Sequence, residues 1–558
     1  MKVVSMKFAL SPKTIKVALC LSLMLTAACQ ASSDTHSSDI PATIVDPVAA
    51  MSGSELAHAI RVGDVSAEQA VGAYLSRINA YDDKGPMLQS IIALNPNALA
   101  EARALDAEAT EGQFRGVLHG VPVLIKENIE TRELPTTAGS LALINNDTGR
   151  DSPIIARLRQ EGAIILGKTN LSEWANYRSN RSVSGWSGIG GLTRNPHALD
   201  RSACGSSAGS GAAVAAFFAP LALGTETNGS ITCPAAMNGI VGFKPTVGLM
   251  SRTHIVPLSP RQDSAGPMTR TVRDAALMLT VMAGADPEDP ATINADNHKR
   301  NYVAQLDGGI NGMRIGVFKW AEGNNPAVSS AFAEALDVLV DQGAILVEIT
   351  DFQPDPVMFR SGDSVLQAEY KQALNAYLAN TPPNVAVRSL PELIAFNEAH
   401  ADRELALFDQ SILIKTEQAS GLDDPEYKAN VSAITIAARA KGVDKLLQDH
   451  NVQVLVMPSA KPASPIDIAF TSRPAGRPLG AGWLAAMAGY PTLTVPMGDH
   501  LGLPLGLMIM GTAWDDALVL KVGHTYEIHA DKMLRPTYAN GPFEMPTKAD
   551  VMRPYKNP

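Results

Sequence analysis

The sequence predicts an α/β protein: one large domain that holds a mixed, mostly parallel twisted sheet covered by helices. Short β-branched runs alternate with helical stretches along the chain, which is the pattern of helices packed on a sheet. Strand-forming runs occur toward both ends, so the sheet is expected to close across a helical insert. No internal repeat or polar linker divides the middle, which favours a single domain although 558 residues could form several average ones.

Periodicity and end signals place the individual elements. A capping box at residues 66–69 opens an amphipathic helix that runs to about residue 81, and residues 97–110 are rich in Ala and Glu and helical. Most of residues 355–449 is helical as well. Strands are expected at residues 89–95, 121–125, 163–166, 239–243, 313–318, 344–347, 452–457, 492–497 and 504–510.

Composition excludes several classes of protein. Hydrophobic residues make up 46% and charged residues 18%, which is typical of a globular chain and excludes disordered, collagen-like and coiled-coil classes. The formal net charge is −10, and no Lys/Arg cluster occurs past the N-terminus, so nucleic-acid binding is not expected. Four cysteines without a CxxC motif form neither a disulfide scaffold nor a zinc ribbon.

The first 28 residues are predicted to be an export signal. Four lysines precede an apolar run at residues 17–25, which is too short to span a bilayer, and small residues follow it. The stretch ending at Cys29 resembles a bacterial lipobox, in which Cys29 becomes the lipidated first residue; simple cleavage near Ala28 is the alternative. Residues 29–50 are then a flexible tether before the domain at 51–558, and the protein is expected in the periplasm, with a lipid on Cys29 anchoring it to the outer membrane.

Three motif matches are rejected because of their surroundings. Residues 162–169 match the phosphate-loop expression, but the variable positions form an apolar strand and not a loop that could wrap a phosphate. Residues 205–209 match the G-x-S-x-G elbow of α/β-hydrolases, but the residues before them contain Pro196 and are loop-like. His524 and His529 are five residues apart, which places them on different faces of a helix and argues against a zinc pair.

Residues 204–248 form the densest unusual stretch. Glycines and small hydroxyl residues at 205–211 and 224–231 allow backbone N–H groups to converge without side chains in the way. Upstream, Lys126 ends an apolar strand, where loss of hydration favours the neutral, basic amine. Each feature alone also has a purely structural interpretation, namely tight turn packing or a lysine whose amine reaches the surface.

Together these residues resemble the amidase signature family. The resemblance covers roughly residues 51–529 and is greatest to bacterial peptide amidases, especially at residues 170–176 and 224–230. It implies that the domain at 51–558 is an amidase with the amidase signature fold. The matching blocks are residues 118–126, 167–174, 204–211, 224–248, 263–267 and 488–496.

The resemblance assigns a Ser-cisSer-Lys triad. Ser230 is the expected nucleophile, Ser206 is the bridging serine after a cis bond from Gly205, and Lys126 is the base. Asn176 is expected to contact the substrate. The oxyanion is expected to bind the backbone N–H groups of Thr227, Asn228, Gly229 and Ser230.

Thr232 and two cysteines near these serines bear on the substrate and on the structure of the site. Thr232 stands where many family members have an arginine, which argues against small dicarboxylate monoamides as substrates. Cys204 and Cys233 flank the two serines and are therefore expected near each other. Separate buried thiols are favoured, although an oxidising periplasm would permit a disulfide.

The export signal and the resemblance together predict an exported amidase that hydrolyses carboxamide C–N bonds through an acyl-Ser230 intermediate, with no cofactor and no metal. Peptide C-terminal amides, which release ammonia, are the leading substrates. Expected partners are a small-molecule or peptide amide, no nucleic acid, and a membrane only through a lipid on Cys29. The alternatives are an aryl or fatty acylamidase of the same family and a catalytically silent amide-binding lipoprotein. The joint presence of Lys126, Ser206 and Ser230 argues against the silent protein.

Overall fold

A computed structural model describes residues 45–466, 480–541 and 550–556. The predicted export signal at 1–28, Cys29 and most of the predicted tether at 29–50 lie outside these residues. The end of the tether is described: Pro47–Ala50 forms helix α2, and Ala49 is fully buried. Residues before the predicted domain boundary at residue 51 are therefore packed.

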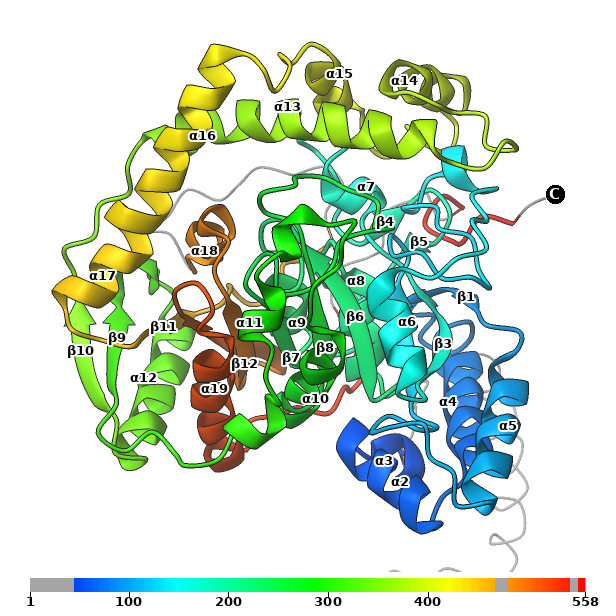
Figure 1. The fold of residues 1–558 in the computed structure, drawn as a ribbon, viewed down its shortest axis with the longest axis horizontal. Helices are drawn as coiled ribbons and strands as arrows, with labels where there is room; N and C mark the ends of the chain where they lie inside the picture. Colours follow the sequence, from blue (N-terminus) through cyan, green and yellow to red (C-terminus); the bar gives the residue numbers. More distant parts are fainter. Residues whose placement is uncertain (1–44, 467–479, 542–549, 557–558) are drawn as a thin grey trace, which may run out of the picture. The chain divides into compact units, whose positions relative to one another are not determined.

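An eleven-stranded mixed sheet forms the centre of the described chain (Figure 1). Its strands lie in the order β1-β3-β2-β6-β8-β7-β12-β13-β11-β9-β10, and β4 (Trp186–Ser187) and β5 (Gly191–Leu192) form a separate ribbon. The strands of the large sheet are β1 (Ile91–Leu94), β2 (Pro122–Lys126), β3 (Ile164–Thr169), β6 (Leu221–Glu226), β7 (Val241–Lys244), β8 (Ser264–Thr269), β9 (Arg314–Phe318), β10 (Ile345–Ile349), β11 (Val454–Pro458), β12 (Thr492–His500) and β13 (Leu503–Met510).

Strand direction divides the sheet into three parts. Parallel pairs form two groups, β3-β2-β6 and β11-β9-β10, while β1 pairs with β3 antiparallel at one edge. Every pair from β6 through β8, β7, β12 and β13 to β11 is antiparallel. A two-residue connection joins β12 to β13, and so short a connection permits only antiparallel pairing. The predicted α/β class with a mixed sheet is confirmed, and its centre is antiparallel.

Helices cover the sheet, and none of those in the described residues has the length and apolar character that a membrane span requires (Figure 1). Helices α13 to α16 lie together along one end of the molecule and make up the helical insert that the sequence predicts. The helices are α3 (Gly53–Val62), α4 (Ala67–Tyr81), α5 (Ala98–Thr110), α6 (Pro153–Gln160), α7 (Glu173–Asn176), α8 (Ala208–Ala215), α9 (Thr232–Met237), α10 (Val272–Met282), α11 (Ala295–His298), α12 (Pro326–Asp341), α13 (Val357–Ala379), α14 (Leu390–Ala399), α15 (Ser411–Glu417), α16 (Pro425–Ala438), α17 (Asp444–Asp449), α18 (Gly482–Ala488) and α19 (Asp516–Ala530).

The local predictions hold at several helix ends and fail at two strands. The capping box is confirmed, because Ser66 Oγ accepts from Gln69 N at 3.0 Å and Gln69 Oε1 accepts from Ser66 N at 2.9 Å. Helix α8 ends at Ala215, and the strand β6 that follows it was not predicted. Strand β8 was missed as well.

Helix α3 is held to the domain by one buried carboxylate. Asp274 on α10 is fully buried, and its two oxygens accept from Gly53 N and Ser54 N at 2.8 Å each. These N–H groups belong to the first turn of α3, where the helix has no internal acceptor and its dipole favours a negative charge. This side chain therefore fixes the first turn of α3 to α10.

We predict that Asp274→Ala lowers the free energy of unfolding by roughly 3 kcal/mol, because it leaves two N–H groups at the start of α3 without an acceptor. Thermal and urea unfolding measure the change. Asp337→Ala on α12 is the control, since Asp337 is exposed and makes no hydrogen bond or ion pair within the described chain. Equal stability of the two variants would contradict this role of Asp274.

Candidate active site

A buried lysine lies where two parallel strands end. Lys126 is the last residue of β2, and β6 pairs with β2 in parallel, so the carboxyl ends of both strands share one edge. Lys126 Nζ donates to Thr225 Oγ1 at 2.8 Å and to the Thr225 carbonyl at 3.2 Å, and it lies 2.7 Å from Ser206 Oγ. A neutral amine can donate its two N–H groups to the two oxygens of Thr225 and accept the Ser206 hydroxyl hydrogen with its lone pair.

The surroundings of Lys126 favour that neutral form. Burial lowers the pKa of Lys126 from its ordinary value to about 7, while the negative charges of Glu226 and Asp263 oppose the shift. A lysine with this pKa exchanges its proton near neutrality and can therefore act as a base.

Two loops bring both serines to this edge of the sheet. Ser206 is fully buried just before α8, and the Gly205–Ser206 bond is cis, as the resemblance implied. The next residue, Ser207, joins the loops: its N–H donates to the Ser230 carbonyl at 3.1 Å, and its hydroxyl donates to the Thr225 carbonyl at 3.1 Å. Hydrogen bonds thus connect β6, the Ser206 loop and the Ser230 loop.

The turn after β6 presents free backbone donors. Within the described chain, the N–H groups of residues 227–230 donate to no acceptor. Gly229 has a φ of 83°, a left-handed conformation that suits glycine. Glu226 fixes the far side of the turn, since its Oε2 accepts from Ile231 N at 2.8 Å and Thr232 N at 3.0 Å. Successive free N–H groups in a fixed turn form a site for a developing negative charge.

Ser230 follows these donors and is the least enclosed of the three predicted residues. It is 8% exposed, whereas Lys126 and Ser206 are fully buried. The Ser230 hydroxyl makes no hydrogen bond within the described chain, so the expected link from Ser206 to Ser230 is not formed here. Hydrogen bonds between catalytic groups often shorten only when substrate binds. The structure therefore pairs Lys126 with Ser206 and places Ser230 on the adjoining loop.

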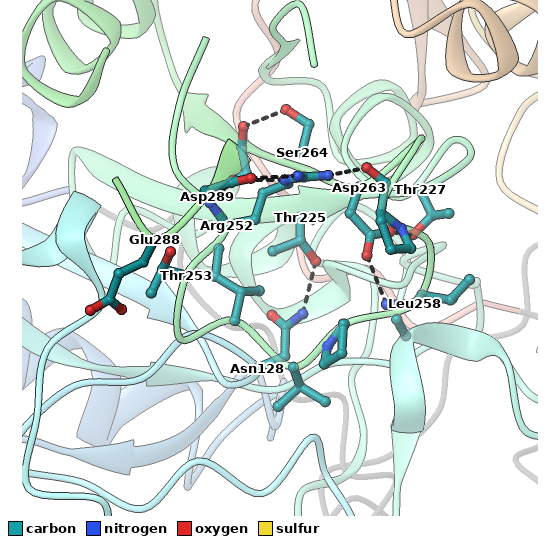
Figure 2. A pocket seen from close by; sticks show the side chains of 16 residues that line it. Asn128, Thr225, Thr227, Arg252, Thr253, Leu258, Asp263, Ser264, Glu288 and Asp289 are labelled. Atoms are coloured by element: carbon teal, nitrogen blue, oxygen red, sulfur yellow. Dashed lines mark hydrogen bonds and ion pairs between the residues drawn. The ribbon is translucent and has the colours of Figure 1, made fainter. Parts of the chain in front are cut away.

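A cavity of about 200 Å³ opens beside this network (Figure 2). Thr225, Thr227 and Asn128 are among the polar residues that line it. Arg252 is paired with Asp289 through contacts of 2.9 and 2.6 Å, and Asp263 accepts from Thr227 Oγ1 at 2.6 Å. The arginine is therefore not free to bind a substrate carboxylate. The apolar lining consists of Ala175, Ile255, Val256, Pro257, Leu258, Pro260 and Ala265.

Asn176 does not line this cavity. Trp174, Ala175 and Asn176 have φ values of 50°, 54° and 69°, so a left-handed turn sends their side chains in different directions. Trp174 is buried in an apolar cluster, Ala175 faces the cavity, and Asn176 lines a neighbouring hollow with Tyr177. A substrate contact of Asn176 stays a prediction. His119 is buried and bonds to the carbonyl of Leu105 at 3.0 Å, away from the serines.

Cys204 and Cys233 form a disulfide, so the favoured prediction of two separate thiols is wrong. Cys204 lies two residues before Ser206 and Cys233 three residues after Ser230. The bond from Ser207 N to the Ser230 carbonyl brings the two loops together, and this proximity places the cysteines within bonding reach. A covalent bond thus joins the two loops that carry the serines.

The rejected motifs have structural roles. Residues 164–169 of the phosphate-loop match are the fully buried strand β3. Ser207, the central residue of the elbow match, is fully buried, and its hydroxyl donates to the Thr225 carbonyl on β6. His524 and His529 both lie on α19. In the part of the chain that the structure describes, no group of three or more His, Cys, Asp or Glu residues is arranged to hold a metal ion.

Comparison with known proteins identifies the family. Residues 69–520 match the family model described as Amidase. The chain belongs to the amidase family. A protein named "Probable amidase" from Arabidopsis thaliana is 35% identical over 475 residues, 83% of this chain and 86% of that protein. The amidase signature resemblance is confirmed, and the chain is a hydrolase that acts on amide C–N bonds.

Solved structures show the same fold. The native peptide amidase from Stenotrophomonas maltophilia is 42% identical, with a TM-score of 0.83, over 88% of this chain and 99% of that one. A structure of the peptide amidase PAM in complex with the competitive inhibitor chymostatin also has 42% identity and a TM-score of 0.83, over 88% of this chain and 100% of that one. This amidase is therefore structurally close to peptide amidases.

Sequence reasoning missed three polar residues of the site. Thr225 binds the lysine amine twice, Glu226 fixes the turn of free N–H groups, and Asn128 lines the cavity. Glu226 and Thr225 lie in the matched block at 224–248, but their roles depend on β6, which the sequence pattern did not reveal. Asn128 lies two residues past the matched block at 118–126, and this proximity to Lys126 was the available signal.

We predict that Cys204→Ala combined with Cys233→Ala lowers the free energy of unfolding by about 3–4 kcal/mol, because the bond closes a loop with a sequence separation of 29 residues. Thermal unfolding of the two proteins measures the difference. Reductant should lower the stability of the wild-type enzyme to that of the variant, and it should not change the stability of the variant. A wild-type enzyme that is indifferent to reductant and matches the variant in stability would contradict the disulfide.

Proposed function

We propose that this amidase is an exported enzyme that hydrolyses peptide C-terminal amides to the free acid and ammonia through an acyl-Ser230 intermediate. The observation that carries the proposal is the fully buried amine of Lys126, which lies 2.7 Å from Ser206 Oγ beside a turn of free N–H groups. This geometry supports the proposed roles of Lys126 as base, Ser206 as proton carrier and the turn as anion site.

The proposed acylation moves one proton along the network. Lys126 takes the proton of Ser206 while Ser206 takes the proton of Ser230, and Ser230 Oγ bonds to the amide carbon. The carbonyl oxygen becomes negative and binds the N–H groups of residues 227–230; the loss of one such donor typically costs roughly 3 kcal/mol. The proton then passes from Lys126 through Ser206 to the nitrogen, the C–N bond breaks and ammonia leaves. Water hydrolyses the ester by the same route.

The cavity supports an uncharged amide as substrate. Its walls are largely apolar, and Arg252 is occupied by Asp289, so no free cation is available for a substrate carboxylate among the residues that line it. Thr232 stands where many family members have arginine, and its N–H and hydroxyl both donate to Glu226. The 42% identity to peptide amidases makes peptide amides the leading class.

Two alternatives remain distinct from this proposal. An aryl or fatty acylamidase would share the network and would differ in the acyl or amine group that the cavity accepts. A silent amide-binding lipoprotein would not need a lysine amine in contact with Ser206, and that contact argues for catalysis.

The proposal includes export to the periplasm. The basic and apolar pattern of residues 1–28 supports it, as does the Cys204–Cys233 disulfide, since such bonds persist in oxidising compartments. Attachment to the outer membrane through a lipid on Cys29 is part of the same proposal.

We predict that kcat/KM rises with pH through about pH 7 and then levels off. Burial lowers the pKa of Lys126 to about 7, so the fraction of neutral amine grows as pH passes this value. Steady-state kinetics between pH 5 and pH 9 on a neutral peptide amide measure the profile. Lys126→Met should lower kcat/KM by about 10²–10⁴-fold and remove this inflection. An unchanged profile in the variant would exclude Lys126 as the base.

We predict that ammonia is released from peptide amides faster than from simple aliphatic amides or anilides. Ammonia assays on a panel of the three classes measure the preference, with Ser230→Ala as the inactive control. Release from simple amides or anilides but from no peptide amide would exclude the proposed substrate class. Undiminished release by Ser230→Ala would exclude the acyl-Ser230 step.

A further inference from the structure

One buried polar atom in the cavity has no partner. Asn128 is 3% exposed, and its Nδ2 donates to Thr225 Oγ1 at 3.0 Å. Its Oδ1 is fully enclosed and accepts no hydrogen bond. A buried carbonyl oxygen without a donor costs about 1–3 kcal/mol, and most such atoms in folded proteins are satisfied. Because Asn128 also lines the cavity, this oxygen can take its donor from a bound ligand.

The position of Asn128 connects that oxygen to the reaction. Asn128 and Thr225 both line the cavity, and Figure 2 shows the hydrogen bond between them. Thr225 Oγ1 in turn accepts from Lys126 Nζ, which lies 2.7 Å from Ser206 Oγ. The side-chain amide of Asn128 is planar, and Thr225 holds its nitrogen, so its oxygen is turned away from Thr225. Thr227, the first residue of the turn of free N–H groups, lines the same cavity.

We propose that Asn128 Oδ1 accepts a hydrogen bond from the N–H of the scissile carboxamide and so selects amides over esters and carboxylates. The inference rests on the proposed function, because it places the substrate carbonyl at the turn of residues 227–230. The amide nitrogen then lies toward Asn128, on the side of the cavity next to the lysine network.

This hydrogen bond would orient the leaving nitrogen. After Ser230 attacks, the nitrogen of a primary amide carries two hydrogens and one lone pair. When one N–H donates to Asn128, the lone pair can face the Ser206 hydroxyl, which must deliver the proton before the C–N bond breaks. The same acceptor would leave an ester alkoxy oxygen without a donor, and it would repel the oxygen of a carboxylate.

A purely structural role of Asn128 accounts for its amide nitrogen but not for its amide oxygen. Nδ2 supports Thr225, which in turn holds Lys126. That support does not require Oδ1, whose enclosed position remains unsatisfied within the described chain. The substrate-binding role and the supporting role therefore belong to different atoms of Asn128, and variants can separate them.

The test compares a peptide amide with the methyl ester of the same peptide. Asn128→Leu, of similar size, should lower kcat/KM for the amide about tenfold more than for the ester, which corresponds to a hydrogen bond of roughly 1.4 kcal/mol. Thr227→Val is the matched control, because Thr227 lines the same cavity and its hydroxyl donates to Asp263, so the change leaves the bond that orients Asn128. It should keep the amide-to-ester ratio within about threefold of wild type. Equal losses on amide and ester in Asn128→Leu, or the same ratio change in Thr227→Val, would overturn the proposal.

Two further measurements separate this inference from folding and from the proposed function. Asn128→Asp keeps an acceptor oxygen, so it should retain the amide preference while its added charge shifts the pH profile to higher pH. In Ser230→Ala, the added Asn128→Leu change should weaken binding of the peptide amide about tenfold and leave binding of the methyl ester unchanged; equal binding changes would also overturn the proposal. If Ser230→Ala still hydrolyses amides, the proposed function fails independently of Asn128.

Discussion

The site depends on one interaction, the contact between the buried amine of Lys126 and the groups around it. Parallel pairing of β2 and β6 places Lys126 and Thr225 at the same edge of the sheet, and the Ser206 hydroxyl completes the set of three oxygen partners. A charged amine would be poorly hydrated there, so burial lowers the pKa of Lys126 to about 7. The sheet thus places this lysine where its amine is largely neutral near pH 7, as the proposed base requires.

The rest of the site is arranged around that amine by backbone contacts. Ser207 joins the loops of both serines, Glu226 holds the turn of free N–H groups, and the Cys204–Cys233 disulfide links the two loops covalently. These attachments hold the N–H groups of the turn in place before the proposed reaction develops a negative charge, as electrostatic preorganisation requires. The cavity beside it has largely apolar walls, and Asn128, Thr225 and Thr227 are among the polar residues that line it.

Much of this arrangement could be predicted from the sequence. Matching blocks placed Lys126 and Ser206 in one site, and alternating patterns gave the fold class and nine of the strands. Strands β6 and β8 were missed because glycines weaken their local strand signal. Close contacts in the folded protein require these glycines. A Cβ at Gly224 would collide with Ser207 Oγ, and one at Gly266 would collide with the Phe243 carbonyl. The disulfide could not be derived either, since spacing in sequence does not set the distance between two cysteines.

The central claim is that Lys126 is largely neutral near pH 7, and a direct titration tests it. NMR of the enzyme labelled at the lysine side chains would follow each amine with pH, and Lys126→Met would identify the signal, since burial also lowers the pKa values of Lys168 and Lys244 to about 8. We expect the assigned signal to titrate near pH 7. Titration of that signal near the ordinary lysine value of about 10.4 would contradict the account.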